Sequence, residues 1–244
     1  MSVSGLSAAA RATLAGVSTA TLTTQLFKRG LRNVFLQGVQ PLARDWPEGR
    51  PNMVGEAFTL RYIPAREDID HLGVFAGTAH PQRRAVEDIP PGHVLVMDCR
   101  GDASAASAGS ILVTRMMVRG AAGVVTDGGL RDSTEIARMA IPCYARAPSA
   151  PTNLIKHHAV DINVPIGCGG VPVFPGDILV GDGEGVVVIP AHLAEDVARD
   201  AGEQEVFERF VIEQVRAGVG IFGLYPPEAE AKAAFEAWRQ ARGL

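Results

Sequence analysis

The clearest indication of the fold comes from residues 122–132, which read Ala-Gly-Val-Val-Thr-Asp-Gly-Gly-Leu-Arg-Asp. The β-branched run predicts a buried strand over residues 123–127, and the two glycines after it predict a tight turn. A charged pair, Arg131 and Asp132, comes directly after this turn. A helix is predicted from Asp132 to Met139. We therefore expect a strand, a turn and a helix, with the charged pair at the junction.

A second junction lies just upstream, at Gly109-Ser110-Ile111-Leu112. These residues predict a helix N-terminus, with the helix running to Arg119. Unpaired amides at a helix N-terminus bind anions, and an arginine can hold a carboxylate through two parallel hydrogen bonds. An aspartate can hold a hard cation such as Mg²⁺. Gly109 to Leu112, Arg131 and Asp132 therefore suit a metal-assisted enzyme that acts on a small keto acid.

Strands and helices alternate through the middle of the chain. Buried strands are predicted at 93–98, 123–127 and 141–145, with helices between them. This alternation predicts a parallel sheet with right-handed crossovers. Ligands bind beyond the carboxyl ends of such strands. Three candidate residues fall at or just after these ends: Asp98, Gly109 and Arg131.

The flanking regions have a different character. Helices are predicted at 5–15 and 19–29, a surface loop at 38–52 and a strand at 54–62. Residues 159–189 predict short strands with glycine turns, among them a hairpin turn at Gly181–Gly185 that lacks the lysine and helix of a phosphate loop. Two further helices are predicted, at 191–217 and 227–242.

Five motifs in this order and spacing resemble the RraA-like family. They are Ala20–Phe27, Val54–Leu60, Val164–Gly170, Val173–Asp177 and Gly181–Pro190, in addition to the two junctions above. The family contains 4-hydroxy-4-methyl-2-oxoglutarate aldolases, oxaloacetate decarboxylases and the regulator of ribonuclease activity A. The resemblance implies an α/β sandwich around a mixed sheet, of the swivelling β/β/α type, with N- and C-terminal helices.

The same resemblance implies how the chain is organised and assembled. It implies one RraA-like domain over residues 1–244, in which residues 218–244 form a C-terminal helical extension. It also implies a homo-oligomer, either a trimer or a pair of trimers. In the family a carboxylate from a neighbouring subunit helps to hold the waters of the metal. Three glutamates of one predicted helix are candidates for that role: Glu203, Glu205 and Glu208. For each of them singly, a position on a solvated helix face is the simpler explanation.

The residues of the family's site map onto this chain one by one. Arg131 matches the arginine that grips the substrate, and Asp132 matches the ligand of Mg²⁺ (or Mn²⁺). The backbone of Gly109, Ser110, Ile111 and Leu112 matches the loop that binds the substrate carboxylate. The chain departs from the aldolases at one position. They carry an acidic residue, then twenty residues, then Arg-Asp, and this spacing places Ser110 at the acidic position.

The resemblance implies a class II, metal-dependent pyruvate aldolase or oxo-acid lyase. Such an enzyme cleaves a C–C bond in a small 2-oxo acid and releases pyruvate, by aldol cleavage, by decarboxylation of oxaloacetate or by both. One alternative is a metal-dependent hydrolase of a 2,4-diketo acid, which Ser110 makes more credible. The other is a non-catalytic regulator that binds an RNA-processing enzyme, although such a protein has no need of Arg131 and Asp132.

Composition narrows the remaining choices. The net charge of −4 and the absence of a basic patch argue against a nucleic-acid partner. An odd count of three cysteines argues against a disulfide framework, and no signal peptide or membrane-length apolar run is apparent. We therefore expect a cytoplasmic protein. Two further interpretations stay open. Asp132 could serve only as the cap of the helix that follows it. His71 and His80 are weak candidates for proton transfer.

Overall fold

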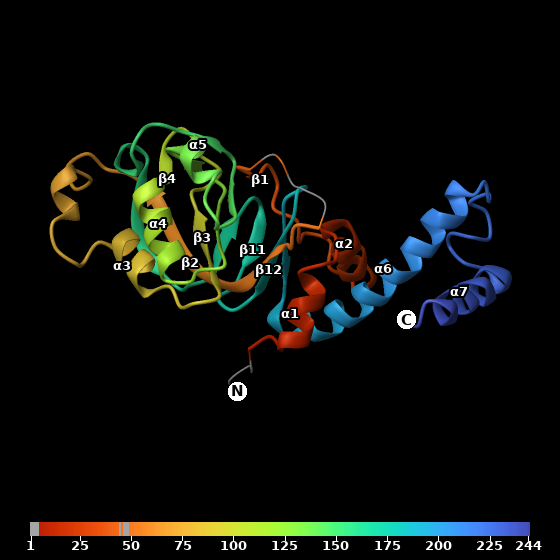
Figure 1. Ribbon diagram of the computed structural model, residues 1–244. Coiled ribbons are helices and arrows are strands. Elements are labelled where there is room, and N and C mark those ends of the chain that lie inside the picture. Colours follow the sequence, from red (N-terminus) through yellow and green to blue (C-terminus); the bar gives the residue numbers. More distant parts are fainter. Residues whose placement is uncertain (1–4, 44, 46–48) are drawn as a thin grey trace.

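The computed structural model describes residues 5–43, 45 and 49–244. Its centre is an eight-stranded mixed sheet in the order β1-β7-β5-β3-β2-β12-β13, with β9 also paired to β2 (Figure 1). The strands of this sheet are β1 (Gln40–Pro41), β2 (Met53–Pro64), β3 (His93–Asp98), β5 (Gly123–Thr126), β7 (Cys143–Ala145), β9 (His157–Ile162), β12 (Ile178–Gly181) and β13 (Val186–Ile189). The α/β fold around a mixed sheet is confirmed.

Four strands of this sheet, β2, β3, β5 and β7, run parallel to one another. The side chains of β3, β5 and β7 are largely buried on both faces, as expected where both faces of a sheet are covered. The predicted strands at 93–98, 123–127 and 141–145 are therefore confirmed, with ends that differ by up to two residues. The predicted loop at 38–52 contains β1, and its residues 44 and 46–48 lie outside the described residues.

A second, three-stranded parallel sheet was not expected. It consists of β4 (Ala106–Ala108), β6 (Gly129–Leu130) and β8 (Ala147–Pro148), in that order. Each of these strands follows a strand of the large sheet along the chain, so that β3, β5 and β7 continue into β4, β6 and β8. An antiparallel hairpin, β10 (Ile166–Cys168) and β11 (Val171–Val173), packs against the large sheet.

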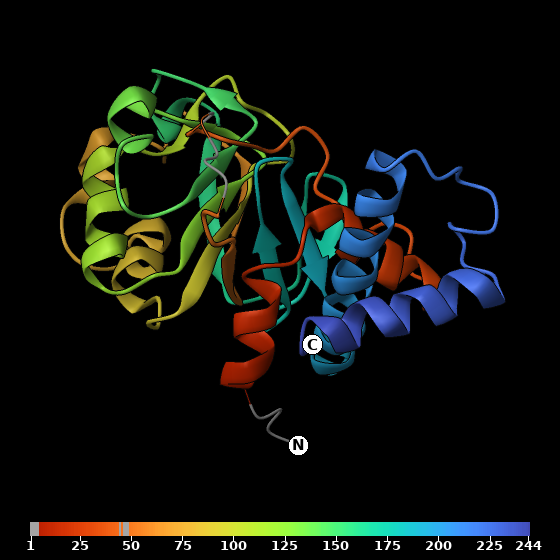
Figure 2. The ribbon, with the colours of Figure 1, turned by 45° about the vertical axis from the view of Figure 1, so that its right-hand side comes forward.

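Helices cover the two ends of the large sheet. Near β2, β3 and β5 lie α3 (Pro81–Asp88), α4 (Ser110–Val118) and α5 (Ser133–Ile136). Near β12 and β13 lie α1 (Ala8–Leu14), α2 (Thr19–Lys28) and the first half of α6 (Ala194–Arg216), as Figures 1 and 2 show. Short 3-10 helices occur at Leu72–Phe75 (η1), Asn153–Ile155 (η2) and Ala191–Leu193 (η3).

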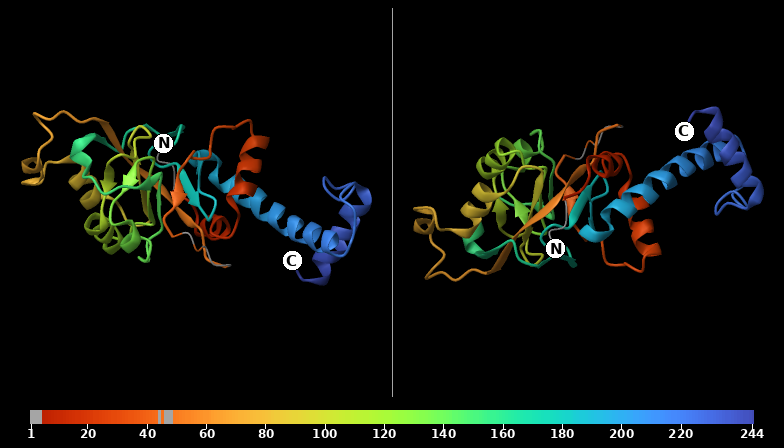
Figure 3. Two further views of the ribbon diagram at one scale, coloured as in Figure 1. Left: turned by 90° about the horizontal axis from the view of Figure 1, so that it is seen from above. Right: turned by 90° about the horizontal axis from the view of Figure 1, so that it is seen from below.

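The chain ends in a helical arm that projects from the body (Figure 3). The far half of α6 carries Phe210, and α7 (Ala229–Ala241) folds back against it through Phe235 and Trp238. The predicted helices at 191–217 and 227–242 are thus confirmed. The division into one domain with residues 218–244 as an extension stays a prediction.

The helix predicted at Asp132–Met139 is wrong in length, because α5 ends at Ile136. After that residue the amides of Arg138 and Met139 donate to carbonyls three residues back, not four, which tightens the chain into a turn. No helix was expected at Pro81–Asp88, although Pro81 is a recognised first helical residue. Among the described residues, no helix is both long enough and apolar enough to cross a membrane.

Candidate functional site

The two junctions of the sequence meet where the small sheet ends. Strands β4 and β6 pair in parallel, with Ala108 opposite Leu130, and the Arg131 amide donates to the Ala108 carbonyl over 3.0 Å. Gly109 and Arg131 therefore leave the sheet side by side. Candidate residues were expected beyond strand ends, and two of the three lie there, but beyond the small sheet and not the large one.

Asp98, the third residue of that group, does not take part. Its carboxylate accepts from the amides of Arg100 and Gly167, at 2.9 and 3.4 Å, and it does not line the pocket described below. Asp98 ends β3, whereas the site lies after β4, which is the next strand along the chain. The difference arises because the short second sheet carries the chain away from the first.

Gly109 is a glycine because two side chains pack directly against it. A Cβ atom built on Gly109 would lie 2.6 Å from Arg131 Cγ and 2.9 Å from Asp132 Oδ2. These are closer than real Cβ contacts, so any other residue would push the arginine and the aspartate away. The Gly109 backbone is extended, with φ of −130°, and it caps α4. A glycine is therefore required here because a larger side chain has no room, and not because the backbone angles exclude other residues.

Asp132 occupies the N-cap position of α5, but its side chain makes no capping hydrogen bond. Its backbone is left-handed, with φ of 54° and ψ of 32°. Oδ2 accepts instead from the Ser110 amide at the start of α4, over 3.1 Å, and Oδ1 accepts from no described residue. Non-glycine residues in this conformation cost about 1–3 kcal/mol and concentrate at functional sites. The explanation of Asp132 as a simple helix cap is therefore wrong.

Arg131 has a largely free guanidinium group. Its Nε lies 3.8 Å from Asp132 Oδ2, which is too far for a good hydrogen bond, and its side chain is 47% exposed. Within the described part of the chain it has no other ion-pair partner. Arg131 is therefore available to bind an anion from solution.

The amides at the start of α4 are only partly available. Ser110 N donates to Asp132, and Leu112 N makes a 3.1 Å contact with the Gly109 carbonyl. Ile111 N donates to no group among the residues described. Of the stretch Gly109 to Leu112, Ile111 thus provides the clearest free helix-N-terminal donor for an anion.

One pocket with a volume of about 220 Å³ is lined by Gly109, Ile111, Leu112, Arg131 and Asp132, whereas Ser110 is not among its lining residues. The sequence did not indicate four of its other residues, which come from η1, α3 and η2: Phe75, Gln82, Arg83 and Asn153. A helix-start signal at Pro81 could have indicated α3, but nothing in the sequence pattern shows that α3 packs beside α4. The Gln82 side chain donates to the Ser107 carbonyl in β4 over 2.5 Å, which ties α3 to the site.

A hard cation fits this pocket through a single protein carboxylate. In the described part of the chain no three His, Cys, Asp or Glu side chains gather closely enough to hold a metal. Asp132, however, keeps one carboxylate oxygen free beside the pocket. Mg²⁺ commonly binds through one or two carboxylates and keeps several waters or substrate oxygens. The donor set therefore suits Mg²⁺ or Mn²⁺ and does not suit a metal that needs several side chains.

The three late glutamates are occupied within the subunit. Glu203 forms an ion pair with Arg239 at 2.9 Å, and Glu205 accepts from the Ser18 amide at 2.9 Å. Glu208 accepts from the Tyr225 hydroxyl at 3.0 Å. Each of them thus has a structural contact inside its own chain.

The two weak histidine candidates are not in the pocket lining. His71 is exposed at the start of η1. His80 packs edge-on against Phe75 at 4.8 Å, and its Nδ1 is buried without a hydrogen-bond partner in the described residues. Burial lowers the pKa of His80, and the charge of Arg83 adds to that effect. A neutral imidazole outside the pocket is poorly placed for proton transfer.

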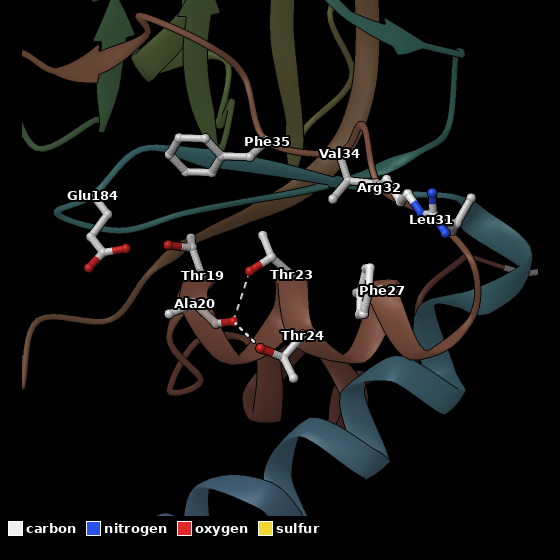
Figure 4. A pocket seen from close by; sticks show the side chains of 10 residues that line it. All are labelled: Thr19, Ala20, Thr23, Thr24, Phe27, Leu31, Arg32, Val34, Phe35 and Glu184. Carbon is white, nitrogen blue, oxygen red and sulfur yellow. Dashed lines mark hydrogen bonds between the residues drawn. The ribbon is translucent and has the colours of Figure 1, made fainter.

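A larger groove of about 780 Å³ lies at the other end of the molecule, between α2 and the segment after it (Figure 4). Its threonine hydroxyls are not free, because Thr23 and Thr24 both donate to the Ala20 carbonyl of their own helix. Its charged lining residues are Arg32 and Glu184. The groove lacks the combination of free carboxylate, free amide and free guanidinium found at Asp132.

Comparisons with known proteins show which family the chain resembles in sequence and in fold. The sequence model of the RraA-like family, described as Aldolase/RraA, matches residues 19–188. A protein of Halalkalibacterium halodurans, named as a candidate 4-hydroxy-4-methyl-2-oxoglutarate aldolase, is 37% identical over 138 residues, which are 55% of this chain. A 4-hydroxy-4-methyl-2-oxoglutarate aldolase of Thermus thermophilus is 32% identical over 108 residues, or 44% of this chain. The aligned stretch spans 65% of the length of each relative.

A solved structure extends the likeness to most of the chain. Streptomyces coelicolor RraAS2, an unusual member of the RNase ES inhibitor RraA protein family, superposes with a TM-score of 0.73 at 28% identity. The superposition covers 85% of this chain and 97% of that one.

Proposed function

The chain belongs to the RraA-like family, and on that premise we propose that it is a divalent-metal-dependent lyase that cleaves a C–C bond in a small 2-oxo acid and releases pyruvate. Aldol cleavage of the 4-hydroxy-4-methyl-2-oxoglutarate type and decarboxylation of oxaloacetate both fit this description. The proposal depends on Asp132, which is held in a left-handed conformation with one carboxylate oxygen free beside Arg131 and the start of α4. The aldolase names of two relatives support it.

Each residue has a distinct part in this proposal. Arg131 grips the substrate carboxylate, and the Ile111 amide at the positive end of α4 adds a further donor. Two such contacts fix the orientation of the 2-oxo group relative to Asp132. Asp132 holds the cation, which when bound supplies Lewis-acid polarisation of the 2-oxo group. Gly109 keeps Arg131 and Asp132 close to the backbone of α4.

No strong general base lines the pocket, because its ionisable residues are Arg83, Arg131 and Asp132. Ser110, at the position of the aldolases' acid, cannot accept a proton at neutral pH without activation. A proton released in the reaction therefore leaves to solvent water. Decarboxylation of oxaloacetate removes no hydroxyl proton and needs less help at this position than aldol cleavage does.

The proposal is tested by following pyruvate release from 4-hydroxy-4-methyl-2-oxoglutarate and from oxaloacetate, with Mg²⁺ and after thorough chelation. We expect release that requires the metal and is lost in Asp132→Asn. A lack of pyruvate from both compounds at saturating Mg²⁺ would overturn the lyase assignment. Hydrolysis of a 2,4-diketo acid in the same assay would instead support the hydrolase alternative.

A regulatory role is the second candidate, because Streptomyces coelicolor RraAS2 belongs to a family of RNase ES inhibitors and shares the fold. A pull-down with a ribonuclease of the E type separates this role from catalysis. Binding that survives Asp132→Asn, together with no pyruvate release by the wild type, would favour the regulator.

The trimer or pair of trimers and the cytoplasmic location are part of the same proposal. The small 2-oxo acid is the proposed partner, without nucleic acid or membrane. Analytical ultracentrifugation of the full chain measures the assembly directly, and a monomer under all conditions would contradict it.

A further inference from the structure

Four residues that line the pocket have no part in the function proposed so far. These lining residues are Gln82 and Arg83 of α3, Phe75 of η1 and Asn153 of η2. Gln82 is bound to β4, whereas Arg83 and Asn153 each present a polar group without a protein partner among the described residues. Buried polar groups are nearly always hydrogen-bonded, so two exceptions in one pocket require an explanation.

Arg83 is held in place but not neutralised. Its guanidinium carbon lies 4.5 Å from the centre of the Phe75 ring, and its Nε is buried without a hydrogen-bond acceptor among the described residues. No ion pair of Arg83 occurs in that part of the chain, whereas the next residue, Arg84, pairs with Asp88 at 2.7 Å. An arginine N–H that is buried and unpaired indicates that an acceptor comes from outside the chain.

Asn153 gives an independent indication of the same kind. Its side chain is buried, with the residue only 4% exposed. Its Oδ1 accepts from the Thr152 hydroxyl over 3.2 Å, whereas its Nδ2 is buried and has no partner among the described residues. Arg83 and Asn153 thus both offer hydrogen-bond donors, and both line the pocket that contains Arg131 and Asp132.

We propose that Arg83 and Asn153 determine substrate specificity by binding a second carboxylate, at the end of the substrate remote from the carboxylate held by Arg131. This inference rests on the proposed function, which assigns the first carboxylate to Arg131. The charge of the pocket favours the same ligand, because two arginines and one aspartate line it and a divalent cation adds further positive charge. A dianion compensates that charge better than a monoanion, and the volume of about 220 Å³ limits the ligand to a small molecule.

The test compares two five-carbon ligands that differ in the second carboxylate, 2-oxoglutarate and 2-oxopentanoate. Their dissociation constants are measured by titration calorimetry with Mg²⁺-loaded protein. We expect the wild type to bind 2-oxoglutarate at least about tenfold more tightly, the effect of a charge-assisted hydrogen bond. Arg83→Gln should remove this preference and change 2-oxopentanoate binding less than about twofold. Arg84→Gln, one residue away but paired with Asp88, is the matched control and should keep the preference.

A second variant guards against misfolding of Arg83→Gln. Asn153→Asp keeps the shape of the side chain and places a negative charge where the second carboxylate should bind, so it should also lose the preference for 2-oxoglutarate. Equal affinity of the wild type for the two ligands would overturn the inference. So would a preference that persists in both Arg83→Gln and Asn153→Asp, or one that Arg84→Gln removes to the same extent.

The experiments distinguish failure of this inference from failure of the proposed lyase function. If no substrate releases pyruvate but the 2-oxoglutarate preference exists and disappears in Arg83→Gln, the binding inference holds and the lyase assignment does not. If pyruvate is released and the two ligands bind equally, the lyase assignment holds and the inference is overturned.

Discussion

Asp127 and Asp132 stand at the two ends of one turn, yet their surroundings differ in almost every respect. Asp127 is 3% exposed, and its carboxylate accepts from three backbone amides: Cys99 at 2.6 Å, Gly101 at 2.9 Å and Gly169 at 3.3 Å. The Asp132 side chain is 39% exposed, accepts from one amide and keeps one oxygen free. Asp127 therefore joins three segments of the fold, whereas Asp132 remains able to bind a ligand.

The difference shows that hydrogen-bond saturation, more than sequence position, separates a structural carboxylate from a functional one. Buried amides that lose their acceptor are costly, so the role of Asp127 is to satisfy them. Asp132 instead occupies a left-handed backbone conformation and accepts a hydrogen bond from only one backbone amide among the described residues. The pair can be tested because each aspartate serves as the control for the other.

The largest effect is expected from Asp132→Ala. Turnover that depends on Mg²⁺ should fall by about a hundredfold to a thousandfold, the range for removal of one group that stabilises a transition state. The free energy of unfolding should change by no more than about 1 kcal/mol, because the side chain is partly exposed. Steady-state pyruvate release and urea unfolding measure the two quantities. Full activity in this variant, or in wild-type enzyme after chelation, would contradict a metal held by Asp132.

Asp127→Ala should have the opposite profile. Three amides lose their acceptor, and at about 1–3 kcal/mol for each unsatisfied group the free energy of unfolding should fall by about 3 kcal/mol or more. The kcat of the folded fraction should stay within about threefold of wild type, since Asp127 does not line the pocket. Urea unfolding and activity at low temperature provide the measurements. A stable but inactive Asp127→Ala would reverse the assignment of the two aspartates.

A smaller effect is expected from Arg131→Lys. Lysine keeps the charge but cannot make the bidentate contact with a carboxylate. We expect kcat/KM to fall at least about tenfold, which corresponds to the loss of one charge-assisted contact of about 1.5–3 kcal/mol. Wild-type kinetics in this variant would show that Arg131 is structural.

Ser110→Asp examines the departure from the aldolases. The new carboxylate restores an acid beside Asp132 and should raise aldol cleavage relative to oxaloacetate decarboxylation, by about a few-fold, because the first reaction has a hydroxyl proton to remove. The ratio of the two rates in wild type and variant is the measurement. Strong aldol cleavage by the wild type that Ser110→Asp does not increase would show that another group supplies this help.

The smallest effect concerns pH. Burial raises the pKa of Asp127 above its usual 3.8, although its three amide donors act in the opposite direction. The folded protein therefore binds the proton on Asp127 more tightly than the unfolded chain does. The stabilisation that results is complete below about pH 3.8 and is lost as the pH rises through the raised pKa. Relative to Asp127→Asn, wild type should gain stability as the pH falls from 7 toward 4. A relative loss of stability over that range in urea unfolding would contradict this sign.

The long elements could be predicted from sequence because their signals are local. Continuous apolar runs indicate the buried strands β3 and β5, and a helix start at Gly109 indicates α4. The motif order was sufficient to indicate the family, which the comparisons confirm. The roles of Arg131 and Asp132 stay predictions, although the structure places both beside Gly109 as expected.

The tertiary structure alone decided the rest. Strands β4, β6 and β8 have two or three residues each, too few for a periodic pattern, and they form only because they pair with one another. Asp127 and Asp132 are both aspartates beside one turn, and the local sequence does not show which is structural. Their roles depend on amides that distant segments supply: those of Cys99 and Gly169 bind Asp127, and that of Ser110 binds Asp132. Arg83 and Asn153 likewise come to the pocket from α3 and η2. Local propensity determines which elements form, whereas packing between distant segments determines which polar groups are satisfied and which stay free for a ligand.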